Sequence, residues 1–277
     1  MMVCSADVLL RGTALPEHES VRLLMAATAR SRSDVILGFD MTNVQARRFE
    51  TFVNRRLSDE PLQYIEGTVP FGPVELIVDS RVLVPRPETE HMFESAVAAV
   101  DRPDVIVDLC CGSGNLALAM AATFPQAATY AVDISQAAVE VTASNAERNQ
   151  LDVEILVGDL FDPLPDSLAG TIDLLITNPP YLAQHELESL PGDVLREPRV
   201  ALRGGIHGDE IVARIAAGAR RWLAPGGVVF CEISEFDTDR FVDHFSDLDG
   251  VVHTDLSGSP RFVVGTKPAT ASDHEVG

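Results

Sequence analysis

The chain has 277 residues, of which 46% are hydrophobic, enough for one large domain or two modest ones with a sizeable core. Its net charge of −21, with Lys267 as the only lysine, disfavours nucleic-acid binding and suits a basic protein partner or a small substrate, although an acidic surface also serves solubility. The sequence has no apolar run that would span a membrane, no secretory signal and no disulfide framework among its four cysteines, so we expect a monomeric cytoplasmic protein without membrane contact.

The first part of the chain is expected to be helical. Apolar residues recur at helical spacing over residues 18–58, and Thr42 is placed to cap a helix that begins at Asn43. We therefore expect a small N-terminal helical domain over residues 1–63. The residues suited to chemistry all lie further along the chain, so we expect this domain to dock a macromolecular substrate.

A hairpin linker is expected over residues 64–84, because Pro70, Gly72 and Pro73 separate short runs of β-forming residues there. A helix then follows over residues 86–100. It leads into the larger part of the chain.

Strands and helices alternate through residues 85–267, which predicts a doubly wound α/β domain. Its further helices are expected over residues 116–123, 136–149 and 208–223, and its last strands over residues 228–232 and 251–265. Residues 268–277 have the composition of a disordered tail.

The first strand of this domain, over residues 105–109, runs into a glycine-rich turn and then a helix. Glycine lets the backbone approach a ligand closely and leaves the helix N-terminus free to receive it. This glycine turn consists of Cys110, Cys111, Gly112, Ser113 and Gly114. Its two cysteines suit a buried structural role better than a redox pair, because adjacent cysteines bridge only with strain.

Acidic residues mark the ends of three successive strands, at Asp108, Asp133 and Asp159. The carboxyl ends of parallel strands share one edge of an open α/β sheet, where such sheets bind ligands. Asp133 lies roughly 20 residues after the glycine turn, where a carboxylate can hold ribose hydroxyls. Each of these acids could instead be an ordinary turn residue at the end of a strand.

The glycine turn lacks the GxGxxG spacing of dinucleotide-binding folds. The acids around it favour a cationic ligand such as a sulfonium.

The fourth strand, residues 172–177, ends in an unusual sequence that we call the Asn178 corner: Asn178, Pro179, Pro180 and Tyr181. The Asn side chain offers a carbonyl acceptor, and the Pro179 carbonyl is a second acceptor held by restricted backbone. Tyr181 adds a flat face. Two acceptors beside an aromatic ring can hold an NH2 group and direct its lone pair outward, whereas Asn-Pro alone would indicate only a turn.

The order of these motifs resembles class I S-adenosylmethionine-dependent methyltransferases that act on amide or amine nitrogens. Residues 60–67, 84–90 and 197–202 narrow the resemblance to the HemK/PrmC family, over residues from about 20 to 264. The family usually has Gly-Thr where this chain has Cys110 and Cys111. Because a side chain disfavours left-handed backbone, we expect an ordinary backbone angle at Cys110.

The resemblance implies a Rossmann-like, seven-stranded methyltransferase domain over residues 85–267. It implies an enzyme that methylates the side-chain nitrogen of the glutamine in the Gly-Gly-Gln loop of peptide-chain release factors. S-adenosylmethionine would lie across the strand ends, with the glycine turn at its amino-acid part and Asp133 at its ribose. Asp159 and Leu160 would border the adenine, and Asp108 and Asn178 would belong to the same site.

Two other functions stay open at this stage. The chain is also compatible with an N-methyltransferase of a nucleobase or small metabolite, and with a non-catalytic cofactor-binding protein. An intact Asn178 corner argues against the latter. Residues 86–90 suit either a helix entry or a contact with cofactor or substrate. The seven histidines show no metal-ligand spacing, so we expect no metal site.

Overall fold

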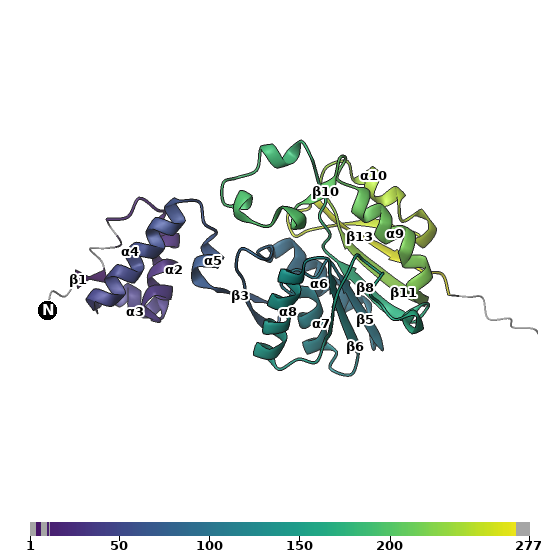
Figure 1. The fold of residues 1–277 in the computed structure, drawn as a ribbon, viewed down its shortest axis with the longest axis horizontal. Helices are drawn as coiled ribbons and strands as arrows, with labels where there is room; N and C mark the ends of the chain where they lie inside the picture. Colours follow the sequence, from purple (N-terminus) through teal and green to yellow (C-terminus); the bar gives the residue numbers. More distant parts are fainter. Residues whose placement is uncertain (1–3, 7–9, 11, 270–277) are drawn as a thin grey trace, which may run out of the picture. The chain divides into compact units, whose positions relative to one another are not determined.

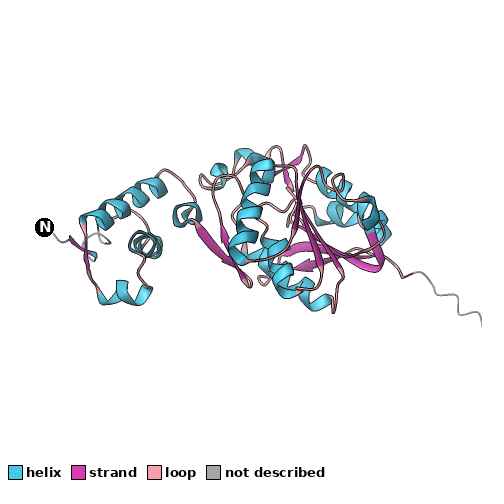
Figure 2. Cartoon of the chain, turned by 60° about the horizontal axis from the view of Figure 1, so that its bottom comes forward, coloured by secondary structure: helices cyan, strands magenta, loops and turns pink. Residues whose placement is uncertain are grey.

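The computed structural model describes residues 4–6, 10 and 12–269, and its chain divides into two compact units (Figures 1 and 2). The first unit extends to Val69 and includes Pro191–Arg196. The second comprises Pro70–Leu190 and the chain from Glu197 onward. Most of the expected tail, residues 270–277, lies outside the described residues.

The first unit is a small helical bundle. Its helices are α2 (Glu17–Thr28), α3 (Arg32–Leu37), α4 (Asn43–Leu57) and α5 (Leu62–Glu66), with a short antiparallel pair of β1 (Cys4–Ser5) and β2 (Asp40–Met41). Thr42 and Gln45 form a capping box at the start of α4, as the sequence predicts for Thr42. Leu23, Leu24 and Phe49 form the centre of its core.

A seven-stranded sheet organises the second unit, in the order β12-β13-β11-β8-β5-β6-β7. The five strands from β11 to β7 run parallel, while β13 is antiparallel to β11 and β12 to β13. The strands are β5 (Val105–Leu109), β6 (Ala128–Asp133), β7 (Glu154–Val157), β8 (Ile172–Thr177), β11 (Leu223–Glu232), β12 (Val251–Thr254) and β13 (Pro260–Thr266). This confirms the predicted fold class.

β11 begins earlier than the sequence predicts. Leu223 already pairs with Ile172 of β8, and after an irregularity the ladder resumes at Val228. The expected strand over residues 228–232 is therefore the regular part of a longer one.

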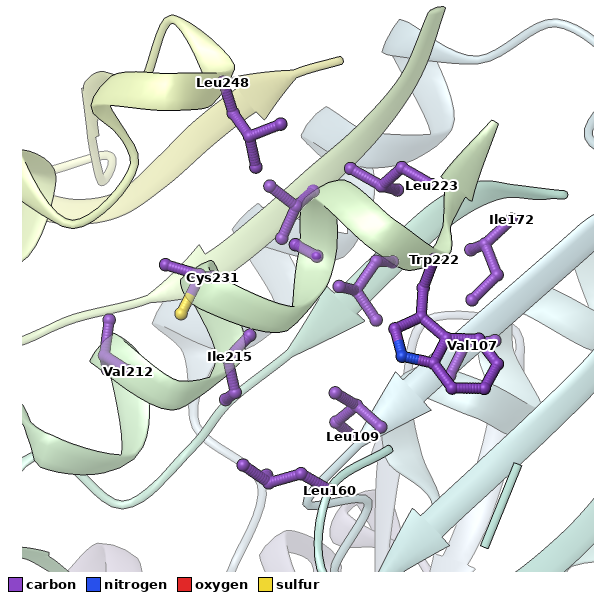
Figure 3. Close-up of a cluster of buried hydrophobic side chains, with 14 of the residues drawn as sticks. Val107, Leu109, Leu160, Ile172, Val212, Ile215, Trp222, Leu223, Cys231 and Leu248 are labelled. Carbon is purple, nitrogen blue, oxygen red and sulfur yellow. The ribbon is translucent and has the colours of Figure 1, made fainter. Parts of the chain in front are cut away.

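Helices cover both faces of the sheet (Figure 1). The helices are α6 (Pro87–Ala99), α7 (Asn115–Thr123), α8 (Gln136–Asn149), α9 (Glu210–Trp222) and α10 (Thr238–Asp243). Figure 3 shows the core beneath α9, where Val212, Ile215 and Trp222 pack with Val107 and Leu109 of β5. Because both faces are buried, the central strands are nearly continuous apolar runs.

Two short strand pairs lie outside the large sheet. β3 (Thr68–Phe71), which begins at the end of the first unit, pairs with β4 (Val74–Ile77) around Gly72 and Pro73, in the expected linker. β9 (Leu182–Ala183) and β10 (Arg203–Gly205) pair after the Asn178 corner.

Gly114 caps α7 in a left-handed conformation, with φ +80°, that L side chains rarely adopt. A Cβ at this position would lie 2.7 Å from Cγ2 of Thr142 in α8. Glycine therefore allows both the turn and the close packing of α7 on α8.

We predict that Gly114→Ala lowers the free energy of unfolding by about 2–4 kcal/mol, through backbone strain and overpacking. Gly170→Ala is a matched control, since Gly170 has φ +79° but nothing within 4 Å of the added Cβ. It should cost only about 1 kcal/mol. Denaturant unfolding measures both, and equal losses would show that crowding against Thr142 contributes nothing.

Candidate functional site

A cavity of about 410 Å³ opens at the carboxyl ends of the parallel strands, within the size range of small-molecule sites. Most of the residues predicted from the sequence line it. These are Cys110, Cys111, Gly112, Ser113, Asp133, Asp159, Leu160, Asn178 and Pro180. The parallel sheet therefore gathers side chains that lie up to 70 residues apart, counted from Cys110 to Pro180.

Asp133 holds the glycine turn in place at the end of β6. Its Oδ2 accepts from the Gly112 amide at 2.9 Å, and its Oδ1 accepts from the Ser135 amide at 2.8 Å. Burial raises the pKa of this carboxyl, while the amide donors act in the opposite direction. Each carboxylate oxygen keeps a second lone-pair direction with which it can accept from a ligand hydroxyl.

Cys110 differs from the sequence prediction. Its φ is +59°, in the left-handed region, so the expectation of an ordinary backbone angle is wrong. The next amide, of Cys111, donates to the Val132 carbonyl of β6 at 3.0 Å. This bond holds the turn against the neighbouring strand and stabilises the strained residue.

The two thiols of the glycine turn are free. Burial, the largest cause, raises the pKa of both Cys110 and Cys111, and nearby acids add to the shift. Both therefore stay protonated and weakly reactive, in agreement with a structural role.

Four predicted residues do not line the cavity: Asp108, Gly114, Pro179 and Tyr181. Asp108 is buried, and its Oδ2 accepts from the Ala117 amide at 3.0 Å in the first turn of α7. This carboxyl supplies the cap that Gly114 lacks. Among the described residues its Oδ1 has no hydrogen-bond partner, and burial raises its pKa well above the usual range.

Asp159 and Leu160 lie at another part of the cavity wall. Oδ2 of Asp159 accepts from Nη2 of Arg214 at 2.9 Å, and the pair is about half exposed. Leu160 is buried in the core cluster beneath α9. A polar group and an apolar surface thus lie side by side, which suits a heteroaromatic ring with an amino substituent.

A buried hydrogen-bond chain reaches Asn178 from two other elements. Nδ2 of Asn178 donates to Oγ1 of Thr89 at 3.0 Å, and this hydroxyl donates to Oε2 of Glu232 at 2.6 Å. The Tyr181 hydroxyl donates to Oε1 of Glu232 at 3.1 Å. Tyr181 therefore uses its polar end inside the protein, and its ring packs against the core.

Thr89 and Glu232 are residues next to the site that the sequence did not predict. Glu232 could have been found, because it ends a predicted parallel strand as Asp133 does. Thr89 lies within the stretch whose role stayed open. In that stretch Nη2 of Arg86 donates to Glu197 at 2.7 Å, and Glu90 accepts from the Gly72 amide at 2.7 Å. Both contacts join this stretch to other segments of the protein.

The cavity lining has features that a sulfonium nucleoside ligand needs. Gly112 has φ +56° and open space where a Cβ would lie, which leaves room for a ligand against the turn. The buried Ser113 hydroxyl has no partner among the described residues. Together with Asp133 and Asp159 these groups offer donors, acceptors and negative charge, so the site fits S-adenosylmethionine.

Two family models match the chain. The Methyltransferase small domain matches residues 91–205, and the PrmC N-terminal domain matches residues 6–67.

Curated relatives match nearly the whole chain. A release factor glutamine methyltransferase of Mycolicibacterium smegmatis is 38% identical over 96% of this chain and 95% of its own length. A protein of the same name from Streptomyces coelicolor is 37% identical over 79% of this chain and 80% of its own length.

Solved structures resemble the chain in fold. A methyltransferase from Pyrococcus furiosus superposes with a TM-score of 0.55 at 17% identity, covering 80% of this chain and 98% of that one. A 16S rRNA N2 G1207 methyltransferase from Thermus thermophilus gives 0.53 at 18% identity, covering 72% and 49%. Because the identity is low, these matches support the α/β methyltransferase fold and nothing more specific.

No helix in residues 4–6, 10 and 12–269 is long and apolar enough to cross a membrane. The same residues contain no group of three or more His, Cys, Asp or Glu side chains placed to hold a metal ion.

We predict that Glu232 makes stability depend on pH. Burial raises its pKa from 4.5 to about 7, so the folded protein holds this proton more tightly than the unfolded chain. Its contribution to the free energy of unfolding is greatest below about pH 4.5 and falls as pH rises to about 7. In Glu232→Gln this loss should be absent. The free energy of unfolding of the variant should therefore rise by roughly 1–3 kcal/mol relative to that of wild type as the pH increases from about 4.5 to about 7.

Denaturant unfolding at both pH values measures the effect. Glu154→Gln, at an exposed position of β7, is the control and should follow the wild-type pH dependence. A constant difference between Glu232→Gln and wild type would contradict the raised pKa of Glu232.

Proposed function

The chain belongs to the release factor glutamine methyltransferase family, and from this premise we propose that it methylates the side-chain amide nitrogen of a glutamine in the Gly-Gly-Gln loop of peptide-chain release factors. One observation carries the chemistry. Asn178 lines the cavity, and its side-chain nitrogen is bound to Thr89. Its carbonyl oxygen is therefore left to accept a hydrogen bond from a substrate amide.

S-adenosylmethionine is the methyl donor of this family, and when bound it supplies an electrophilic methyl group on sulfur. In our proposal the glycine turn, with Gly112 and Ser113, holds its amino-acid part. Asp133 accepts from its ribose hydroxyls, and Asp159 and Leu160 border its adenine. Asp108 supports the turn indirectly, because it accepts from the Ala117 amide in the first turn of the helix that follows.

Asn178 acts on the acceptor nitrogen from the cavity wall, and the Pro179 carbonyl is the second acceptor that the sequence predicts, although Pro179 is absent from the cavity lining. An amide nitrogen is a poor nucleophile because its lone pair is delocalised. Two acceptors that hold its N–H groups orient this nitrogen, and orientation lowers the barrier. The N–H groups become more acidic as the nitrogen pyramidalises, so both acceptors bind more tightly in the transition state. A proton leaves to water afterwards, and no strong base is required.

Tyr181 has a different part in this scheme from the one its sequence suggests. A ring that stacks on the substrate amide would face the cavity, and Tyr181 is absent from the cavity lining. Its hydroxyl bonds to Glu232 instead. We propose that Tyr181 supports the Asn178 corner from inside.

Methylation of a release factor tests the proposal directly. The purified protein with labelled S-adenosylmethionine should label the glutamine of the Gly-Gly-Gln loop. It should not label tRNA or small amides. Asn178→Ala should lower kcat by ~10²-fold or more at saturating cofactor, the scale of a lost transition-state hydrogen bond. Cofactor affinity should change much less.

The label is located by mass spectrometry, and calorimetry measures cofactor binding. The matched control is Asn149→Ala, in α8, where the side-chain amide bonds to backbone groups of Glu75 and Asn145. Label found only on tRNA or on a small amide would show that the acceptor is not the release factor glutamine. Wild-type turnover by Asn178→Ala would overturn the role of Asn178.

We also propose that the helical unit docks the release factor. Ile36, Leu37 and Val44 of α3 and α4 are 76%, 84% and 69% exposed, although they are large and apolar. A protein partner can bury such side chains, and a free small substrate has no use for the helical unit that carries them.

We predict that a short peptide carrying Gly-Gly-Gln is a poor substrate, with kcat/KM at least ~10-fold below that of whole release factor, because it lacks remote binding energy. Leu37→Asp should raise KM for whole release factor and leave the peptide rate unchanged. Leu256→Asp is the control, at an equally exposed Leu (86%) of the second unit, and should change neither. Equal rates for peptide and whole protein would make the helical unit purely structural.

A further inference from the structure

We propose that Thr89 and Glu232 are positioning residues that fix which end of the Asn178 side-chain amide faces the cavity. This inference rests on the proposed function, since it concerns how Asn178 presents an acceptor to the substrate nitrogen. Neither residue lines the cavity. Each acts through the hydrogen-bond chain that ends at Asn178.

The amide of Asn178 has two orientations of nearly equal shape that exchange its oxygen and nitrogen. Only one presents the carbonyl oxygen to a substrate N–H group. The other presents an NH2 group, which repels the substrate NH2 because both are donors. The reaction therefore needs a partner that selects the first orientation.

Thr89 can make this selection only if its own hydroxyl proton is committed elsewhere. A hydroxyl both donates and accepts, so it can bond to either end of an amide. Here the Thr89 hydroxyl donates to Glu232 at 2.6 Å. Its remaining lone pairs then accept only an N–H group, and Nδ2 of Asn178 supplies one at 3.0 Å.

Glu232 sets the direction of the chain because an ionised carboxylate only accepts. Thr89 donates to Oε2 and Tyr181 to Oε1, so both oxygens are engaged. Thr89 and Glu232 are 0% and 1% exposed. Water therefore cannot replace either partner at low cost. Thr89 lies in α6, Asn178 in the loop after β8, and Glu232 in β11. Tertiary packing therefore fixes this hydrogen-bond chain.

Protonation of Glu232 would reverse the selection. A protonated carboxyl donates to Thr89, whose own proton is then free to bond to Oδ1 of Asn178 and turn the NH2 group toward the cavity. The groups that face Glu232 are Thr89 and Glu88 of α6, Tyr181, and Arg261 of β13. Burial raises the pKa of Glu232 to about 7, while the hydroxyl donors and Arg261 lower it. The selection thus depends on pH near neutrality.

The first test compares Thr89→Val with Thr89→Ser in the release factor assay. Valine keeps the shape of threonine but cannot accept from Asn178, so kcat should fall about 10- to 100-fold. Serine keeps the hydroxyl and should restore most of the rate. Cofactor affinity by calorimetry should stay near wild type in both, which also shows that the variants are folded. Equal kcat for Thr89→Val and wild type would overturn the proposal.

The second test is the pH profile of kcat, and it does not depend on the folding of Thr89→Val. Wild-type kcat should rise from about pH 6 to about pH 8 as Glu232 ionises. Glu232→Gln should lose this rise, and the surface control Glu154→Gln should retain it. A rise that persists in Glu232→Gln would overturn the proposal. The proposed function fails separately, if wild-type protein does not label the release factor at any pH.

Discussion

The backbone register of three parallel strands determines the site. Thr177, the last residue of β8, pairs with Leu109 of β5 on one side and with Cys231 of β11 on the other. Its hydroxyl also donates to the Leu109 carbonyl at 2.6 Å, which ties the strand ends together. The next residue along each strand therefore falls at the same level of the sheet. These residues are Cys110, Asn178 and Glu232.

This register places polar groups where the apolar interior of the sheet meets the cavity, and their burial has a cost. Burial raises the pKa values of Asp108, Asp133 and Glu232, because the interior disfavours the charged form of each carboxyl. Such shifts are common at functional sites, where stability is given up for a fixed arrangement of polar groups. The hydrogen bonds to Ala117, Gly112 and Thr89 offset only part of that cost.

The sequence predicts what depends on local pattern. Apolar runs fix the strands and the strand-end residues Asp133 and Asn178, and capping chemistry fixes the start of α4 at Thr42. It does not predict contacts that depend on tertiary packing. Thr89 and Glu232 are 143 positions apart, and only the packing of α6 against β11 joins them. The left-handed Cys110 is equally hidden, because the bond that accompanies it, from the Cys111 amide to β6, is also a tertiary contact.

In the proposed function the glycine turn binds the cofactor, and the hydrogen-bond chain orients the side chain that contacts the substrate. The glycine turn presents backbone and small side chains, which bind a cofactor without needing a defined side-chain orientation. The Asn178 corner needs a defined orientation, because an amide rotated by half a turn has the same shape and the opposite hydrogen-bonding character. Shape complementarity alone cannot distinguish the two states. A buried acceptor such as Glu232, acting through the hydroxyl of Thr89, can do so, and this gives a physical reason to bury a carboxylate behind the site.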